Sequence, residues 1–135
     1  MTTDPWLFTE LDCKLYDRMT PVARRDFYRR KFMPRLLRYL CECHGYKLYL
    51  VERGIGLEMV ATLQYKTGVE VTLQLSEIQW RVFGKPMELI FIQNGCKIAR
   101  LQAESGEKLN FLFIDAIATC LANASSRRDQ ELTPR

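Results

Sequence analysis

The residue types best suited to chemistry lie in a short cationic stretch near the N-terminus. Arginine and lysine side chains can neutralise phosphates, and the aromatic residues among them, Phe27, Tyr28, Phe32 and Tyr39, can stack on bases. Asp26 is the only acid between the first and last of these cations. We therefore predict a nucleic-acid-binding surface, most suited to single strands, with phosphate contacts from Arg24, Arg25, Arg29, Arg30, Lys31, Arg35 and Arg38.

Other interpretations of the same stretch stay open. The basic stretch could lie against an acidic protein or an anionic membrane, or it could be a solvated helix face. Tyr49 and Tyr65 are further candidates for base stacking, whereas Trp80 is expected in the core. The second hypothesis is a protein adaptor or a small chaperone-like dimer. It would recruit its partner through a sheet edge or through the apolar residues of the N-terminal arm, Trp6, Leu7, Phe8 and Leu11.

The cysteines and the single histidine suggest no catalytic or metal site. Cys41, Cys43 and His44 are close together, but zinc sites usually leave two to four residues between their cysteines. Cys43 also falls on an apolar stripe, so we interpret these residues as packed thiols. No activated nucleophile and no complete glycine-rich phosphate loop is recognisable. We predict a protein that is not an enzyme and has no metal, cofactor or small-molecule substrate.

Composition indicates a folded intracellular protein. The chain has 135 residues, 47% of them apolar, and a net charge of +4, which fits one globular domain with a mildly basic surface. Its five cysteines are an odd number at irregular spacing, which favours reduced thiols in the cytoplasm or nucleus. The best candidate for a membrane span, Leu109 to Ala124, is interrupted by Asp115. We therefore expect no membrane association.

The hydrophobic pattern predicts an α+β fold that begins with a helix. Thr20 and Pro21 form a helix start, and Gly45 is suited to a helix end. Between them lies an amphipathic basic segment, and Pro34 predicts a kink or two consecutive helices. After this segment the hydrophobic period changes to two. The expected strands cover residues 47–53, 57–66, 69–75, 88–93, 97–102 and 109–113.

A sheet-plus-helix order occurs twice in this pattern and predicts a duplicated βββα unit. A capping box from Ser76 to Gln79 predicts the first helix, and Asp115 is expected to cap the second, which ends near Asn123. One such unit cannot cover its own apolar face, so the two must pack together. We predict one domain, residues 1–135, made of an apolar arm (1–16), a basic helical segment (17–45), two units (46–86 and 87–124) and a flexible tail (125–135).

The stretch Val71 to Trp80, VTLQLSEIQW, resembles the strand-to-helix junction of the Whirly proteins. The same junction occurs in their relatives, the positive-cofactor-four transcriptional coactivators. With the repeated order of strands and helix, the resemblance covers about residues 46–124 and implies a single-strand-binding or transcription-associated protein. A long first helix, three strands, a helix, two or three strands and a last helix is also similar to the small chaperones of bacterial type III secretion. Those are usually acidic homodimers, whereas this chain is basic.

Overall fold

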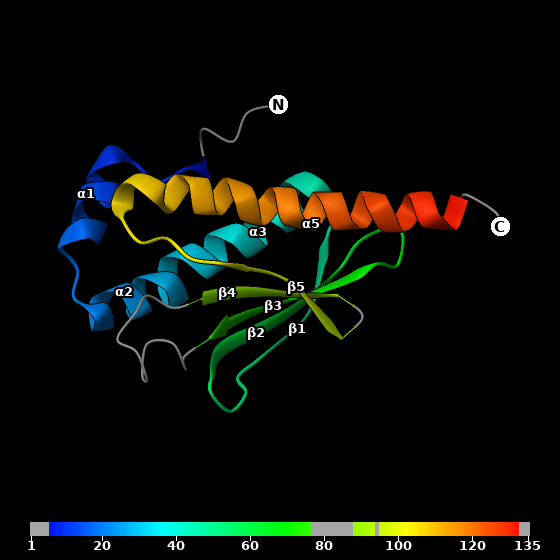
Figure 1. The fold of residues 1–135 in the computed structure, drawn as a ribbon, viewed down its shortest axis with the longest axis horizontal. Coiled ribbons are helices and arrows are strands. Elements are labelled where there is room, and N and C mark those ends of the chain that lie inside the picture. The colour runs from blue at the N-terminus through cyan, green and yellow to red at the C-terminus, as the bar shows by residue number, and fades with distance from the viewer. Residues whose placement is uncertain (1–5, 77–87, 94, 133–135) are drawn as a thin grey trace.

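The protein consists of a five-stranded antiparallel sheet with its helices gathered on one face (Figure 1). The computed structural model describes residues 6–76, 88–93 and 95–132. The strand order is β1-β2-β3-β4-β5, so every strand pairs with its neighbours along the chain. The described elements, in chain order, are α1 (Glu10–Arg18), α2 (Pro21–Phe27), the π-helical turn η2 (Tyr28–Phe32), α3 (Met33–His44), β1 (Lys47–Glu52), β2 (Leu57–Gln64), β3 (Glu70–Ser76), β4 (Glu88–Gln93), β5 (Cys96–Leu101), the 3-10 turn η3 (Gly106–Lys108) and α5 (Leu109–Leu132).

Side-chain caps start the first two helices. The Thr20 hydroxyl accepts a hydrogen bond from the Ala23 amide, and Pro21 occupies the first turn of α2, as predicted. Thr9 caps α1 in the same way, by accepting from the Asp12 amide while the Asp12 carboxylate accepts from the Thr9 amide. A helix therefore begins inside the arm for which the sequence showed no regular period.

The predicted break near Pro34 takes the form of a π-helical turn. The Met33 amide donates to the carbonyl of Tyr28, five residues earlier, so η2 widens the helix just before the proline. A proline ring crowds the carbonyl four residues before it, and a wider turn relieves this contact. The basic segment is thus α2 and α3 joined without a loop. Gly45 ends α3 at φ 74°, as predicted, in the left-handed region that favours glycine.

The five strands predicted between residues 47 and 102 are confirmed. Apolar side chains alternate clearly in β2 and β3, whereas β1 and β4 contain continuous apolar runs. The predicted helix after Ser76, including Trp80, lies outside the described residues. The three strands β1 to β3 are thus followed by the two strands β4 and β5 and then by α5.

The strand predicted at residues 109–113 is wrong, because this segment is the start of α5. A strand here would bury residues 109, 111 and 113 on one face, but Phe111 is 63% exposed. The buried positions follow the helical spacing of three and four residues. They are Leu109, Leu112, Phe113, Ala116, Ile117 and Cys120. An alternation of only five residues fits either structure. The second unit therefore lacks a third strand, and the predicted duplication of βββα units is not confirmed. The predicted tail from residue 125 is likewise wrong as far as Leu132.

An aromatic core lies between the sheet and the helices. Phe8, from the N-terminal arm, is buried with its ring 5.8 Å from that of Phe32 and 6.1 Å from that of Phe113. The Asn110 side chain fixes this arm to α5, since it accepts from the Phe8 amide at 2.8 Å and donates to the Phe8 carbonyl at 3.0 Å. The arm is thus part of the folded domain.

Two buried tyrosines add a polar contact within this core. The Tyr16 hydroxyl donates to the Ala103 carbonyl at 2.7 Å and lies 2.5 Å from the Tyr28 hydroxyl. The Ala103 amide in turn donates to the Tyr28 hydroxyl. Burial raises the pKa of both tyrosines, so both stay neutral donors. The network joins α1 and η2 to the segment that follows β5.

Gly106, at the start of η3, lies directly against the backbone of α1. Its amide donates to the Asp17 carboxylate at 2.8 Å. A Cβ atom at this position would lie 1.8 Å from the carbonyl oxygen of Cys13. Only glycine therefore allows α1 to pack at this distance.

Replacing Gly106→Ala should lower the free energy of unfolding by about 3 kcal/mol or more, because the backbone of α1 must move. Gly54→Ala is a matched control, since its Cβ would meet only the flexible Leu57 side chain, at 3.2 Å. Urea unfolding of the two variants measures the difference. An equal effect of the two substitutions would contradict the close packing of α1 on η3.

Candidate binding surfaces on either side of α3

Two of the arginines predicted to bind phosphates hold the N-terminal region in place. The Arg24 guanidinium donates to the carbonyls of Tyr16 and Glu104 and lies 4.5 Å from the centre of the Tyr16 ring. The Arg35 guanidinium donates to the carbonyls of Trp6 and Leu7, and it lies 4.2 Å from the centre of the Phe8 ring. Both therefore satisfy backbone acceptors within the fold.

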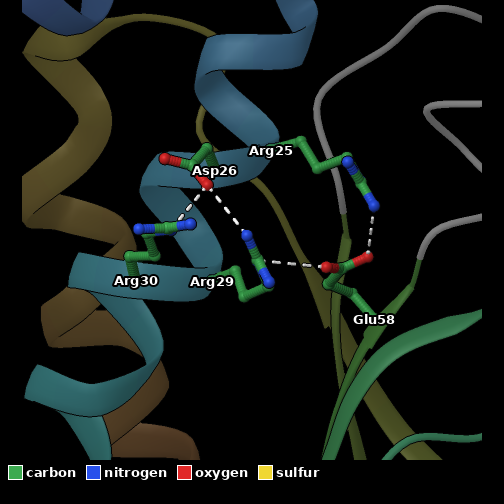
Figure 2. Close-up of polar contacts among 5 residues, drawn as sticks. All are labelled: Arg25, Asp26, Arg29, Arg30 and Glu58. Carbon is green, nitrogen blue, oxygen red and sulfur yellow. Dashed lines mark hydrogen bonds and ion pairs between the residues drawn. The ribbon is translucent and has the colours of Figure 1, made fainter.

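Two further arginines neutralise a buried carboxylate (Figure 2). Glu58 is an extra residue in β2, between the partnered positions Leu57 and Met59. Its side chain is only 2% exposed and is reached by Arg25 at 3.1 Å and Arg29 at 3.2 Å. A buried carboxylate requires such partners. No local pattern signals this role, because Glu58 occupies an ordinary polar position of an alternating strand.

Asp26 pairs with Arg30 and with Arg29, which also reaches Glu58 on the sheet (Figure 2). Its carboxylate lies 3.0 Å from Arg29 and 2.8 Å from Arg30, and the hydrogen bond from Arg29 does most to lower the pKa of this carboxyl. Asp26 is half exposed, so the pairs are screened by water. Arg30 remains 69% exposed despite its pair and is available to a ligand.

Substituting Glu58→Gln should lower the free energy of unfolding by about 2 kcal/mol, because Arg25 loses an ionised hydrogen-bond acceptor and Arg29 loses an ion-pair partner. The exposed Asp26→Asn change is the control and should have little effect. Thermal unfolding at neutral pH measures both. Equal losses would show that Glu58 contributes no more than a surface pair.

A basic groove lies beside α3, on the side of the N-terminal arm. It has a volume of about 510 Å³. It is lined by Trp6, Arg30, Lys31, Pro34, Arg35 and Arg38. The Trp6 ring is fixed edge-on against Tyr39, with ring centres 5.2 Å apart. Of the predicted phosphate contacts, the structure brings these four cations together and directs Arg24, Arg25 and Arg29 elsewhere.

The remaining predicted site residues are dispersed. Tyr49 is 70% exposed on β1, whereas the Tyr65 ring packs against Tyr46 with centres 4.8 Å apart. In the arm, Trp6 and Leu7 are half-buried against the core, Phe8 is inside it, and Leu11 is 65% exposed. The four apolar arm residues therefore do not form one exposed patch.

An apolar groove lies between α3 and the edge strand β1. It has a volume of about 310 Å³. It is lined by Pro34, Leu37, Cys41, Leu48, Val51 and Met59, with Arg38 and Glu42 also contributing. Arg38 and Glu42 form an ion pair of 3.1 Å with each other. A concave surface of this composition suits apolar side chains of a ligand.

Strand β1 itself is unusually apolar for an exposed strand. It lies at the end of the strand order and pairs only with β2. Its central residues Leu48, Tyr49, Leu50 and Val51 are between 46% and 70% exposed. A free edge with exposed apolar side chains is a template for another strand.

The opposite edge of the sheet differs in character. Strand β5 carries Lys97 and Arg100, and Arg100 lies 3.6 Å from Glu88. Charged side chains of this kind are a common protection of edge strands against pairing. The two edges of the sheet are thus chemically distinct, and β1 is the one suited to strand addition.

The cysteines and the histidine do not converge. Cys43 is exposed and Cys41 is half-buried, and burial raises the pKa of the Cys41 thiol. Burial also raises the pKa of Cys120 to about 12 and lowers that of His44, so neither is charged at neutral pH. Within residues 6–76, 88–93 and 95–132, no three potential metal ligands of the His, Cys, Asp or Glu type come together.

The chain matches no protein-family model, no curated protein and no solved structure. None of the helices in the described part of the chain has the length and apolar character needed to cross a bilayer. A function therefore has to be argued from the two grooves and from the β1 edge.

Proposed function

We propose that this protein is a non-enzymatic protein-binding module whose edge strand β1 pairs with a strand of another polypeptide. The observation that carries the proposal is the exposure of four consecutive large apolar residues, Leu48 to Val51, on a strand with one unpaired edge. Exposed contiguous apolar surface of this kind marks interaction sites in stable proteins.

The groove beside β1 explains how such a partner would be selected. Leu48 and Val51 pair with the core residues Leu63 and Ala61, so they lie on the face that the helices cover. An added strand would hydrogen-bond to the β1 backbone, and its apolar side chains on that face would enter the groove against Leu37. Main-chain hydrogen bonds to β1 would supply the affinity, and the fit of the partner's side chains in the groove would supply the specificity.

The proposal predicts that position 49 is in contact with a partner. Tyr49 is replaced by the photo-cross-linking residue p-benzoylphenylalanine in the full chain, which is then irradiated in cells of the organism that encodes it. Because Tyr49 lies on the unpaired edge, we expect a specific covalent adduct, identified by mass spectrometry.

The matched control carries the same photo-cross-linking residue at Phe111, which is 63% exposed on α5. Phe111 has similar size and exposure but lies away from the strand edge, on the helical layer. Adducts of equal yield and identity from the two positions, or none from position 49, would overturn the proposal.

A second candidate function is the binding of single-stranded nucleic acid in the basic groove. The observation that favours it is the convergence of Arg30, Lys31, Arg35 and Arg38 on the Trp6 side chain, which combines phosphate-binding and stacking groups. The transcription-associated role implied by the resemblance to the Whirly proteins belongs to this candidate.

Fluorescence anisotropy with labelled single- and double-stranded DNA and RNA at two salt concentrations tests this candidate. We expect single strands to be preferred and binding to weaken with salt. Lys31→Glu should remove about one phosphate contact and reduce the slope of log affinity against log salt by about 0.7. Lys97→Glu makes the same charge change on β5 and should leave binding unchanged. Absence of binding at low salt would exclude the candidate.

A further inference from the structure

We infer that the strand that pairs with β1 is β1 of a second copy of this chain, in an antiparallel arrangement about a two-fold axis. The inference rests on the proposed function, because it names the partner of the same edge. Its basis is that β1 is complementary to itself in charge, in side-chain type and in the order of its faces.

The charges of β1 match when the strand is reversed. Its sequence is Lys-Leu-Tyr-Leu-Val-Glu, with Lys47 at one end and Glu52 at the other. An antiparallel pair of β1 strands in the symmetric register sets Lys47 of each copy opposite Glu52 of the other copy. The same register sets Leu48 opposite Val51 and Tyr49 opposite Leu50. Two ion pairs therefore enclose four apolar pairs, and no like charges meet.

The faces of the strand match in the same register. Lys47 and Glu52 pair within the chain with Gln64 and Val60, and Leu48 and Val51 pair with Leu63 and Ala61. Residues 60 and 64 of β2 share one face, and residues 61 and 63 share the other. The Lys47–Glu52 pair and the Leu48–Val51 pair thus each join side chains of one face.

A bulge between Leu48 and Leu50 of β1 allows the faces to match in this register. In a regular strand of six residues the symmetric register would oppose side chains of opposite faces. Between Leu48 and Leu50, however, β1 advances two residues while β2 advances one, so Tyr49 is an extra residue. Tyr49 lies at the centre of the strand and restores the symmetry of its two halves.

The apolar groove would be closed by this arrangement. Val51 of the second copy would stand beside Leu48 on the face that bears the groove, where Leu37 and Cys41 of α3 leave space. By symmetry the same contact occurs twice, so the two grooves join across the axis into one apolar layer. The exposed side chains of Leu48 and Val51 would then be covered without any other protein.

The other edge does not offer this complementarity. A symmetric antiparallel pair of β5 strands would set Lys97 of one copy opposite Arg100 of the other. Like charges directly opposite each other disfavour pairing. Dimerisation through the sheet is therefore directed to β1, and it would stop at two copies.

Charge exchange at the ends of β1 tests the inference by sedimentation velocity of the purified full chain at low salt. We expect a concentration-dependent dimer for the natural sequence. Lys47→Glu places two carboxylates at each end of the strand pair, and Glu52→Lys places two ammonium groups there. Each variant alone should dimerise roughly thirtyfold more weakly, which corresponds to about 2 kcal/mol.

Mixing the two variants should restore a dimer, because a mixed pair brings opposite charges together at both ends. The double variant Lys47→Glu/Glu52→Lys should also dimerise. Lys108→Glu makes the same charge change at an exposed position of η3 and should dimerise like the natural protein. Circular dichroism checks that each variant is folded, and the mixture remains informative because unfolded chains could not restore the dimer.

Two outcomes would overturn the inference. One is a protein that stays monomeric at high concentration, and the other is a dimer that both charge variants leave intact. Neither would overturn the proposed function, which fails separately if position 49 gives no specific adduct. An adduct at position 49 with a different protein, together with a monomeric chain, would retain the function and reject the second copy as partner.

Discussion

The width of the sheet relative to its helical cover determines which strand remains exposed. Five strands at about 4.8 Å spacing are about 24 Å wide, whereas two packed helices such as α3 and α5 cover about 20 Å. Leu48 and Val51 face the covered side but remain nearly half exposed. The apolar groove follows from this mismatch, because the edge strand β1 extends beyond α3 and is not fully buried by it.

The cationic helices serve first to hold the layers together. Arg24 and Arg35 fix backbone carbonyls of the N-terminal region, and Arg25 and Arg29 neutralise Glu58 on the sheet. Regional charge is therefore a poor guide to function here. In the basic groove, Arg30, Lys31 and Arg38 are exposed and remain placed for an external anion. Pro34 and Arg38 line both grooves, so a ligand in either one would border the other.

Local signals in the sequence were sufficient for much of the backbone. Thr20, Pro21 and Gly45 mark the bounds of the basic helical segment. Alternating or β-rich runs between glycine-containing turns identify the five described strands. These signals act between near neighbours, so they hold in any fold that the chain adopts. The strand predicted at residues 109–113 was wrong because an alternation this short fits a strand and a helix equally well. Only the packing of this segment against the sheet decides between the two structures.

The amino-acid sequence by itself determined the α+β class, the helical segment from Pro21 to His44 and the five described strands, since capping and hydrophobic pattern depend on adjacent residues. Only the tertiary structure decided which arginines form ion pairs or hydrogen bonds within the fold, because Arg25 and its partner Glu58 are 33 residues apart. It also decided that β1 is an edge with a partly open face. Exposure of a strand depends on how far the helices reach across the sheet, and no local pattern contains that distance.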